Sequence, residues 1–334
     1  MRHHHPGLRT NKPDLVIQTV SGQIAHPVGG PSPWRIGNDG KLRVLPATGG
    51  ITINKRIGDR CVGLAADHVE PGVSLHNNGR EVIGARNGPN MALVTYACVG
   101  NQARVISGPA AGATGIVTGK HGGVYHVMVD FPKPVLCKLR IGDRIQIYSY
   151  GLGLSLTDYP DIAVTNCAPG LLRRWGIRER AGMLEVPVTH CVPAGIIGSG
   201  LGKNTVWRGD FDIQLFDPAV RARFGLGSIR FGDVVAVTDN DARFGPSYRS
   251  GRTTIGIIVH SDSTVSGHGP GITALLTGPR ALLRPVQDPA ANLASVYGVR
   301  TLAPPRAYRP LAGQRQHLMP PDTARLALPV NELT

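Results

Sequence analysis

The chain has 334 residues, and its 36 Lys and Arg against 22 Asp and Glu give a formal charge of +14. Its 44 glycines and 27 prolines make up about a fifth of the residues, against a usual share of roughly 12%. Both are poor helix formers, so the composition excludes a helical bundle and favours short strands joined by tight turns. The apolar share of 41% and charged share of 17% exclude global disorder.

The sequence predicts neither membrane association nor disulfide bonding. No apolar run approaches the roughly 18 residues needed to span a bilayer, and residues 1–15 lack the apolar core of a signal peptide. The five cysteines are widely spaced and contain no CxxC pair, which argues against a disulfide framework and a thiolate zinc site. We therefore expect a cytoplasmic protein with no membrane partner.

The positive charge is concentrated near the two ends of the chain. Residues 1–60 and 280–334 carry most of the excess, whereas residues 61–279 are nearly balanced. A basic surface raises weak, salt-dependent affinity for polyanions. The sequence shows no RNA-binding signature, helix-turn-helix pattern or basic run interleaved with aromatic residues. We therefore do not expect nucleic acid to be the ligand.

In chain order, four regions differ in pattern. Residues 1–40 are rich in Pro and Gly and predict an extended arm, and residues 280–334 predict a second, Pro-rich arm. Between them, residues 41–150 and 151–279 each alternate apolar segments with Gly-rich turns, which is typical of β-structure. The predicted fold class is mainly β, with two barrel- or sandwich-like units, few short helices and extended terminal arms. We expect the arms to join subunits of a homo-oligomer.

A short Arg-x-Gly-Asp pattern occurs three times, at residues 56–59, 140–143 and 230–233. The second and third copies lead into the apolar segments DRIQIYSYG and DVVAVTDND. Gly-Asp favours a tight turn, so each of these two copies predicts a turn followed by a buried strand. Helix signals are few, and residues 218–224 after the potential N-cap Asp217 predict one short helix.

The densest polar clustering lies between residues 210 and 268. Asp210 and Asp212 are two apart, so on a strand they share one face. Further acids and histidines follow apolar segments, where loops at strand ends commonly carry function. Such oxygen and nitrogen ligands suit a divalent metal ion, Zn, Mn, Mg or Ca. The predicted metal ligands are Asp239, Asp241, His260 and His268.

Candidate acid–base groups occur in two places. In residues 66–74 (ADHVEPGVS), His68 and Glu70 share one face if the segment is a strand. Asp212 and Asp262 supply carboxylates in the second half of the chain, and all four residues are predicted catalytic groups. The sequence leaves open whether the two places meet in one site.

Two Gly-rich segments are predicted to contact the substrate. The segment GKHGG places Lys120 and His121 at a hairpin tip, where they can reach a ligand. Ser199 lies in the segment GSGLG, which differs from the nucleophile elbow and is expected to cover or contact the ligand.

Several segments resemble an uncharacterised prokaryotic family known only as a domain of unknown function. These are GKHGG, FGDVVAVTDND, VHSDS, SGHGPG and ADHVEPGVS. The resemblance covers roughly residues 40–280, and it implies a shared fold without assigning an activity.

The second half of the chain also resembles the acetamidase/formamidase family. Gly209-Asp210-Phe211-Asp212-Ile213 precedes a Gly-Asp strand and the acidic turn at residues 239–241. In that family such residues contribute to a metal-dependent amidase site on a β-rich scaffold. Here Asp210 replaces an Asn, and the acidic turn differs from the Gly-Asp-Gly-Glu of that family.

These observations favour a metal-assisted hydrolase acting on an amide, lactam or related C–N bond of a small molecule. The ion would activate water or polarise the carbonyl, Asp212 or Glu70 would take the water proton, and His68 would protonate the leaving nitrogen. One alternative is a metal-free lyase, isomerase or cyclase in which His260 or His268 works with Asp262. A second alternative is a β-barrel without catalytic activity that binds RNA or another polyanion.

Overall fold

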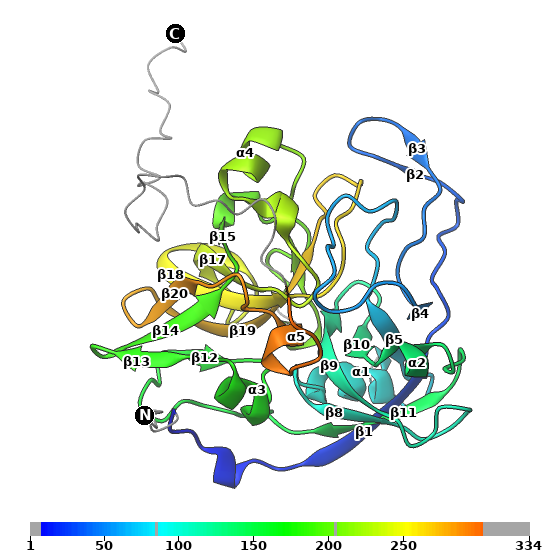
Figure 1. Ribbon diagram of the computed structural model, residues 1–334, viewed down its shortest axis with the longest axis horizontal. Helices are drawn as coiled ribbons and strands as arrows, with labels where there is room; N and C mark the ends of the chain where they lie inside the picture. Colours follow the sequence, from blue (N-terminus) through cyan, green and yellow to red (C-terminus); the bar gives the residue numbers. More distant parts are fainter. Residues whose placement is uncertain (1–7, 84–85, 204–205, 303–334) are drawn as a thin grey trace.

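The computed structural model of the chain describes residues 8–83, 86–203 and 206–302 (Figure 1). As the sequence predicts, these residues form a mainly β protein with few short helices. None of the described helices is long and apolar enough to cross a membrane.

The first half of the chain is a β-barrel. Its sheet closes because β1 pairs with both β11 and β5, and β4 adds to the start of β5. The interior is apolar, with buried Val, Leu and Ile side chains packed against α1 (Gly88–Tyr96). In sheet order, the strands are β1 (Gln18–Ile24), β11 (Arg144–Ser149), β8 (Gln102–Val105), β9 (Thr114–His121), β10 (His126–Asp130), β5 (Gly72–His76) and β4 (Ile51–Thr52).

The second half contains a larger and a smaller sheet, drawn mostly in green, yellow and orange in Figure 1. The larger has the order β12 (Ala163–Val164), β19 (Gly271–Pro279), β18 (Ser247–Ile258), β17 (Val234–Asp241) and β15 (His190–Pro193), with β16 (Phe211–Asp212) also pairing β19. The smaller has the order β13 (Arg178–Arg180), β14 (Met183–Val188) and β20 (Leu283–Gln287).

The remaining elements are short. Asp217 caps α4 by accepting hydrogen bonds from the first-turn amides, as the sequence predicts. These elements are β2 (Arg35–Ile36), β3 (Leu42–Arg43), β6 (Val82–Ile83), β7 (Arg86–Asn87), α2 (Lys133–Leu136), α3 (Pro169–Arg174), α4 (Pro218–Arg223), α5 (Leu293–Val296), η1 (Lys12–Asp14), η2 (Ala194–Ile196), η3 (Val206–Arg208) and η4 (Leu226–Ser228).

The three Arg-x-Gly-Asp copies form the same turn. In each, the Asp carboxylate accepts a hydrogen bond of 2.8–2.9 Å from the backbone N–H of the Arg three residues earlier. Each Gly has a positive φ of 79–89°, a conformation that strains residues with a side chain. The turns end at Asp59, Asp143 and Asp233, and the last two lead directly into β11 and β17.

Both predicted arms contain regular structure. Within residues 1–40, β1 lies between β11 and β5 and completes the barrel. Gly22 permits this close packing, because a Cβ there would lie 2.8 Å from the Leu93 side chain. Within residues 280–334, β20 pairs in parallel with β14, and α5 follows it. Residues 303–334 of the predicted arm lie outside the described residues.

The two halves meet along β9. The hydroxyl of Thr273 in β19 accepts a hydrogen bond from the Lys120 backbone N–H and donates one to the Lys120 carbonyl. A core cluster also joins Met128 of β10 to Ile257 of β18. This contact brings the end of β9 to the loops that surround the larger sheet.

Candidate functional site

Six polar side chains from five separate segments converge at the seam between the halves, with Asp210 and Asp212 in the same segment. His121 is the last residue of β9, and Asp212 is the last residue of β16. His260 follows β18, whereas His268 and His68 lie in the loops that precede β19 and β5. The two polar regions of the sequence, around residue 68 and from 210 to 268, therefore form one site.

A first group consists of His68, Asp212 and His268, whose potential ligand atoms all lie within 4.8 Å of one another. His268 Nδ1 is 3.0 Å from His68 Nε2 and 3.1 Å from Asp212 Oδ2. His68 Nε2 is also 3.6 Å from Asp212 Oδ2. Two imidazoles and one carboxylate thus point at one small volume, as ligands around a divalent cation do.

A second group consists of His121, Asp210 and His260, again with ligand atoms within 4.8 Å of one another. His260 Nε2 lies 2.7 Å from Asp210 Oδ2, and the His121 and His260 rings are 4.4 Å apart. Both of these close atoms are buried, and neither has a hydrogen bond of normal geometry. A bound cation would satisfy both of them at once.

Asp212 connects the two groups. Its Oδ2 faces His268 and His68, while its Oδ1 lies 3.5 Å from His260 Nε2. The His68 and His260 rings are 5.1 Å apart. A carboxylate with one oxygen toward each of two ligand groups has the arrangement of a bridging ligand in a two-metal site.

The neighbouring groups orient the rings of His121 and His260. His121 Nδ1 is 2.7 Å from Glu70 Oε1, and His260 Nδ1 is 2.9 Å from the Ser261 carbonyl. These oxygens accept the Nδ1 proton of each ring, so Nε2 faces the cluster and, in the neutral ring, carries the free lone pair. Metal-ligating histidines are commonly oriented by carboxylates and carbonyls in this way.

Glu70 is fully buried beneath this cluster. Its carboxylate also receives hydrogen bonds from Gly49 N–H, Ser74 Oγ and His126 Nδ1. Burial opposes ionisation of Glu70, but the bonds from His121 and His126 outweigh it and hold the pKa below its usual range. Glu70 therefore carries a fixed negative charge behind the site.

Asp67 has a similar place behind His68. Its Oδ2 lies 3.4 Å from His68 Nδ1 and accepts a 2.8 Å hydrogen bond from Arg35. Ser263 Oγ and Thr264 N–H donate to the other oxygen. Burial is outweighed by the interactions with His68 and Ser263, so the pKa of Asp67 is also lowered.

The cluster favours positive charge. Burial opposes charge on Asp212 and on His260, but their mutual interactions and the nearby acids outweigh it. The pKa of Asp212 lies well below its usual value, and the pKa of His260 lies well above. The pKa of His68 is raised for the same reason, through Asp212 and Asp67. The site therefore attracts protons or metal ions.

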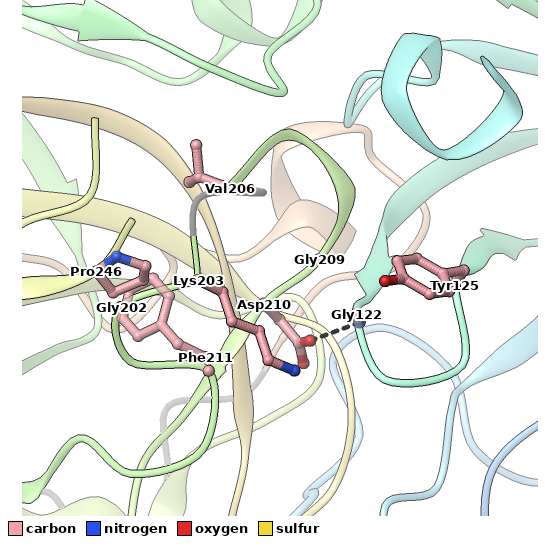
Figure 2. Close-up of a pocket in the computed structure, with 10 residues that line it drawn as sticks. Gly122, Tyr125, Gly202, Lys203, Val206, Gly209, Asp210, Phe211 and Pro246 are labelled. Carbon is pink, nitrogen blue, oxygen red and sulfur yellow. Dashed lines mark hydrogen bonds between the residues drawn. The ribbon is translucent and has the colours of Figure 1, made fainter. Parts of the chain in front are cut away.

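A cavity of about 450 Å³ opens beside the second group. Asp210 lines it, and Asp210 Oδ1 accepts a 2.8 Å hydrogen bond from the Gly122 N–H across the cavity wall (Figure 2). Tyr125, Lys203 and Phe211 contribute further lining side chains. A small molecule in this cavity would reach the carboxylate of the second group.

Two predicted metal ligands, Asp239 and Asp241, lie away from the histidines. In the β17–β18 pairing, Asp241 is opposite Ser247, whereas His260 follows the other end of β18. The seven residue steps of β17 from Val234, opposite Ile257, to Asp241 rise about 3.3 Å each, which separates the two ends by roughly 23 Å. Asp239 is paired with Arg280. The structure thus separates these acids from His260 and His268, because they occupy opposite strand ends.

Asp262 and Ser199 support the site through their backbones. The Asp262 carbonyl accepts a hydrogen bond from the His68 N–H, while its side chain accepts one from Gly63 N–H. The Ser199 carbonyl accepts a hydrogen bond from the Asp212 N–H. Asp262 is in neither ligand group. Instead of the predicted pairing of Asp262 with His260 or His268, Asp210 pairs with His260 and Asp212 pairs with His268.

Lys120 points into the protein interior, although it was predicted to reach the substrate. It is fully buried, and its ammonium donates to the Thr95 carbonyl, the Asn166 side chain and the Trp207 carbonyl. Burial lowers its pKa to about 7. Adjacent strand residues point to opposite faces, so His121 reaches the cluster and Lys120 does not.

The sequence patterns predict no role for Asp210, Asp67 or His126. For Asp210 a signal was available, because its two-residue spacing from Asp212 on a strand predicts a common face. Asp67 lies in a segment where the strand alternation considered for His68 and Glu70 does not apply, because His68 has a φ of 52° and β5 begins only at Gly72. His126 had no local signal, since only the β9–β10 pairing sets it opposite His121.

Comparisons with known proteins match nearly the whole described chain. Residues 34–173 match a family described as "Domain of unknown function (DUF4438), N-terminal", and residues 174–297 match "Domain of unknown function (DUF4438), C-terminal". A structure titled "Crystal structure of TM1086" is 40% identical with a TM-score of 0.81, covering 89% of this chain and 100% of that chain. A search of curated proteins finds no match. Each matched region supplies part of the His/Asp cluster.

Proposed function

The chain belongs to the DUF4438 family, and we propose that it is a metal-dependent hydrolase of an amide, lactam or related C–N bond in a small molecule. The observation that carries this proposal is the pair of three-residue ligand groups joined by Asp212. The cavity lined by Asp210 supplies a place for a substrate beside one group.

The donor set fits two divalent ions. Each group offers two imidazoles and a carboxylate, a set that suits Zn or Mn better than Ca or Mg. Such ions, when bound, polarise a carbonyl and lower the pKa of water. Glu70 holds the His121 ring through a hydrogen bond, which reduces the ordering required when a metal binds, and the Asp67 carboxylate lies 3.4 Å from His68 Nδ1.

The protein's own groups then handle the proton. Hydrolysis forms a C–O bond from water to the carbonyl carbon and breaks the C–N bond, while one water proton must travel to the leaving nitrogen. Asp210 belongs to a ligand group and also lines the cavity, so we assign it this transfer. Glu70 is unsuited to it, because it is fully buried and is not among the residues that line the cavity.

The likeness to the acetamidase/formamidase family supports a C–N bond as the target. The segment that carries the likeness, residues 209–213, contributes Asp210 and Asp212 to the two ligand groups. This is the part of the cluster that approaches the cavity.

Metal content and turnover test the proposal together. Protein lacking residues 1–6, whose three histidines would bind metal by themselves, should carry close to two Zn or Mn ions per chain by elemental mass spectrometry. The protein should also turn over at least one member of an amide and lactam panel. His268→Gln should lose one ion and most activity. The control His190→Gln changes a buried histidine outside both groups and should keep both ions. Wild-type protein that takes up no metal on reconstitution would overturn the proposal.

A metal-free lyase, isomerase or cyclase is the second candidate. It is favoured by the 2.7 Å approach of His260 Nε2 to Asp210 Oδ2, which also fits an imidazolium–carboxylate pair for acid–base chemistry. Activity that survives exhaustive chelation, and that His260→Gln abolishes, would select this candidate over the hydrolase.

A further inference from the structure

We propose that the substrate carries a carboxylate or another anionic group, which the ammonium of Lys203 binds while the scissile bond lies at Asp210. This inference rests on the proposed function and names its substrate class. Its basis is that Lys203 and Asp210 line the same cavity.

Among the described residues that line the cavity, Lys203 is the one cationic side chain and Asp210 the one anionic side chain. Figure 2 shows Lys203 and the Tyr125 hydroxyl approaching it from different sides, with Asp210 between their parent segments. Asp210 is already engaged, by the Gly122 N–H and by His260. The charge that remains for a ligand to neutralise is therefore that of Lys203.

Lys203 has no ion-pair or hydrogen-bond partner for its ammonium among the described residues. This distinguishes it from Lys120, whose ammonium donates to three oxygens in the interior. A lysine ammonium is a flexible point charge with three donors. At the edge of a cavity it suits an anionic ligand, and the positive net charge of the chain attracts the same ligands over a longer range.

The backbone around Lys203 is held in place against the β17–β18 connection. The Gly202 N–H donates a 2.9 Å hydrogen bond to the Pro246 carbonyl. Gly245 lies so close that a Cβ there would come within 2.6 Å of the Lys203 carbonyl. The exposed side chain of Lys203 thus extends from a packed segment at the edge of the cavity.

The dimensions of the cavity limit the ligand. A volume of about 450 Å³ lies in the range of small-molecule sites. Its wall at Gly122 and Gly209 is backbone against backbone, because a Cβ on Gly209 would lie 2.6 Å from the Gly122 Cα. The substrate is therefore a small anionic amide or lactam.

Matched hydroxamates separate the charge of the ligand from its affinity for metal. Hydroxamates bind divalent ions, and the monohydroxamates of malonic, succinic and glutaric acids add a carboxylate at three distances. Propano-, butano- and pentanohydroxamic acids replace that carboxylate with a methyl group. Binding of each probe to the metal-loaded full chain would be measured by isothermal titration calorimetry. Lys203→Met and Lys203→Arg would be compared with the exposed-lysine control Lys133→Met.

We expect at least one anionic probe to bind about tenfold more tightly than its neutral partner. Lys203→Met should remove this preference, whereas Lys203→Arg and Lys133→Met should keep it. Equal binding of every matched pair to wild-type protein would overturn the anionic-substrate inference and leave the metal centre standing. Failure of all neutral hydroxamates to bind, with no metal retained, would overturn the proposed function and this inference with it.

Discussion

Acidic side chains lie at both ends of the paired strands β17 and β18, but their partners differ. At the far end, the Asp241 carboxylate is within 3.4 Å of guanidinium nitrogens of Arg243, Arg249 and Arg252. At the end near His260, Asp212 faces three imidazoles instead. Arginine stays protonated and has no acceptor atom. It therefore neutralises a carboxylate but offers no lone pair of its own to a metal ion. A neutral imidazole offers a lone pair beside the carboxylate, which is what a metal ion requires.

The partners of an acid at a strand end therefore decide whether it is suited to bind a metal ion. Burial opposes ionisation of Asp241, but hydrogen bonds from Arg243 lower its pKa. Asp241 is therefore an ionised carboxylate whose charge is already compensated. Asp210 and Asp212 are also next to basic groups, but these are histidines, which release their protons to solvent when a cation takes the nitrogen lone pair.

The largest expected difference is between Asp212→Asn and Asp241→Asn. Asp212→Asn removes the charge that joins the two ligand groups, so bound metal should fall from two ions to one or none. Turnover should fall at least about 100-fold, the size of effect seen when a group that stabilises developing charge is lost. Asp241→Asn should keep metal and turnover, and lower stability by about 1 kcal/mol because three arginines lose their counter-charge. Elemental analysis, steady-state kinetics and urea unfolding measure the three quantities.

Equal metal loss in both variants would contradict this separation of the two strand ends. It would mean that Asp241 acts on the cluster through the sheet, since the strand register places it far from the histidines.

A smaller effect is expected from Glu70→Gln, which changes a group behind the ligands. The introduced amide is neutral, so it accepts the His121 Nδ1 proton more weakly than the carboxylate does. Metal affinity should therefore fall about 10- to 100-fold. Competition with a chelator of known affinity measures this. The control Glu185→Gln changes a carboxylate near Arg180 and Arg284 and should leave affinity unchanged. Unchanged affinity in Glu70→Gln would show that the hydrogen bond to His121 does not support metal binding.

Local patterns in the sequence predict local features of the fold. The Arg-x-Gly-Asp turns, the strands after two of them, and the helix capped by Asp217 follow from residues within a few positions of one another. The presence of His260 and His268 in loops next to strands also follows from local apolar runs. Such features need no knowledge of the distant chain.

Distant pairings set the remaining features. Barrel closure depends on β1 meeting β11, more than 100 residues away, and residues 18–24 carry only a weak strand pattern. The choice between Asp210 and Asp239 as a candidate ligand could not be made locally, because both lie near predicted strand ends. It is decided by the β16–β19 pairing, which brings Asp210 to His260, and by Arg280, which pairs with Asp239.

The smallest expected effect comes from a second comparison, between two buried histidines. His260 lies among acids, and its pKa is raised. His190 lies between the hydroxyls of Thr189 and Ser228, and burial lowers its pKa to about 4. The pKa of a histidine in the unfolded chain is near 6.5. Between about pH 6.5 and pH 4, the unfolded chain therefore holds a proton at His190 that the folded chain does not. Its contribution to stability is therefore complete above about pH 6.5 and is lost as pH falls through 4.

We expect His190 to account for about 2 kcal/mol of stability lost between pH 7.5 and pH 4.5. In His190→Gln this contribution is absent, so its free energy of unfolding should decline less over the same interval. Urea unfolding of both proteins at each pH gives the two differences, and the contribution of the His/Asp cluster, which both proteins share, cancels between them. Parallel declines would show that the His190 pKa is the same in the folded and unfolded chains, and that burial among hydroxyls does not by itself keep a histidine neutral here.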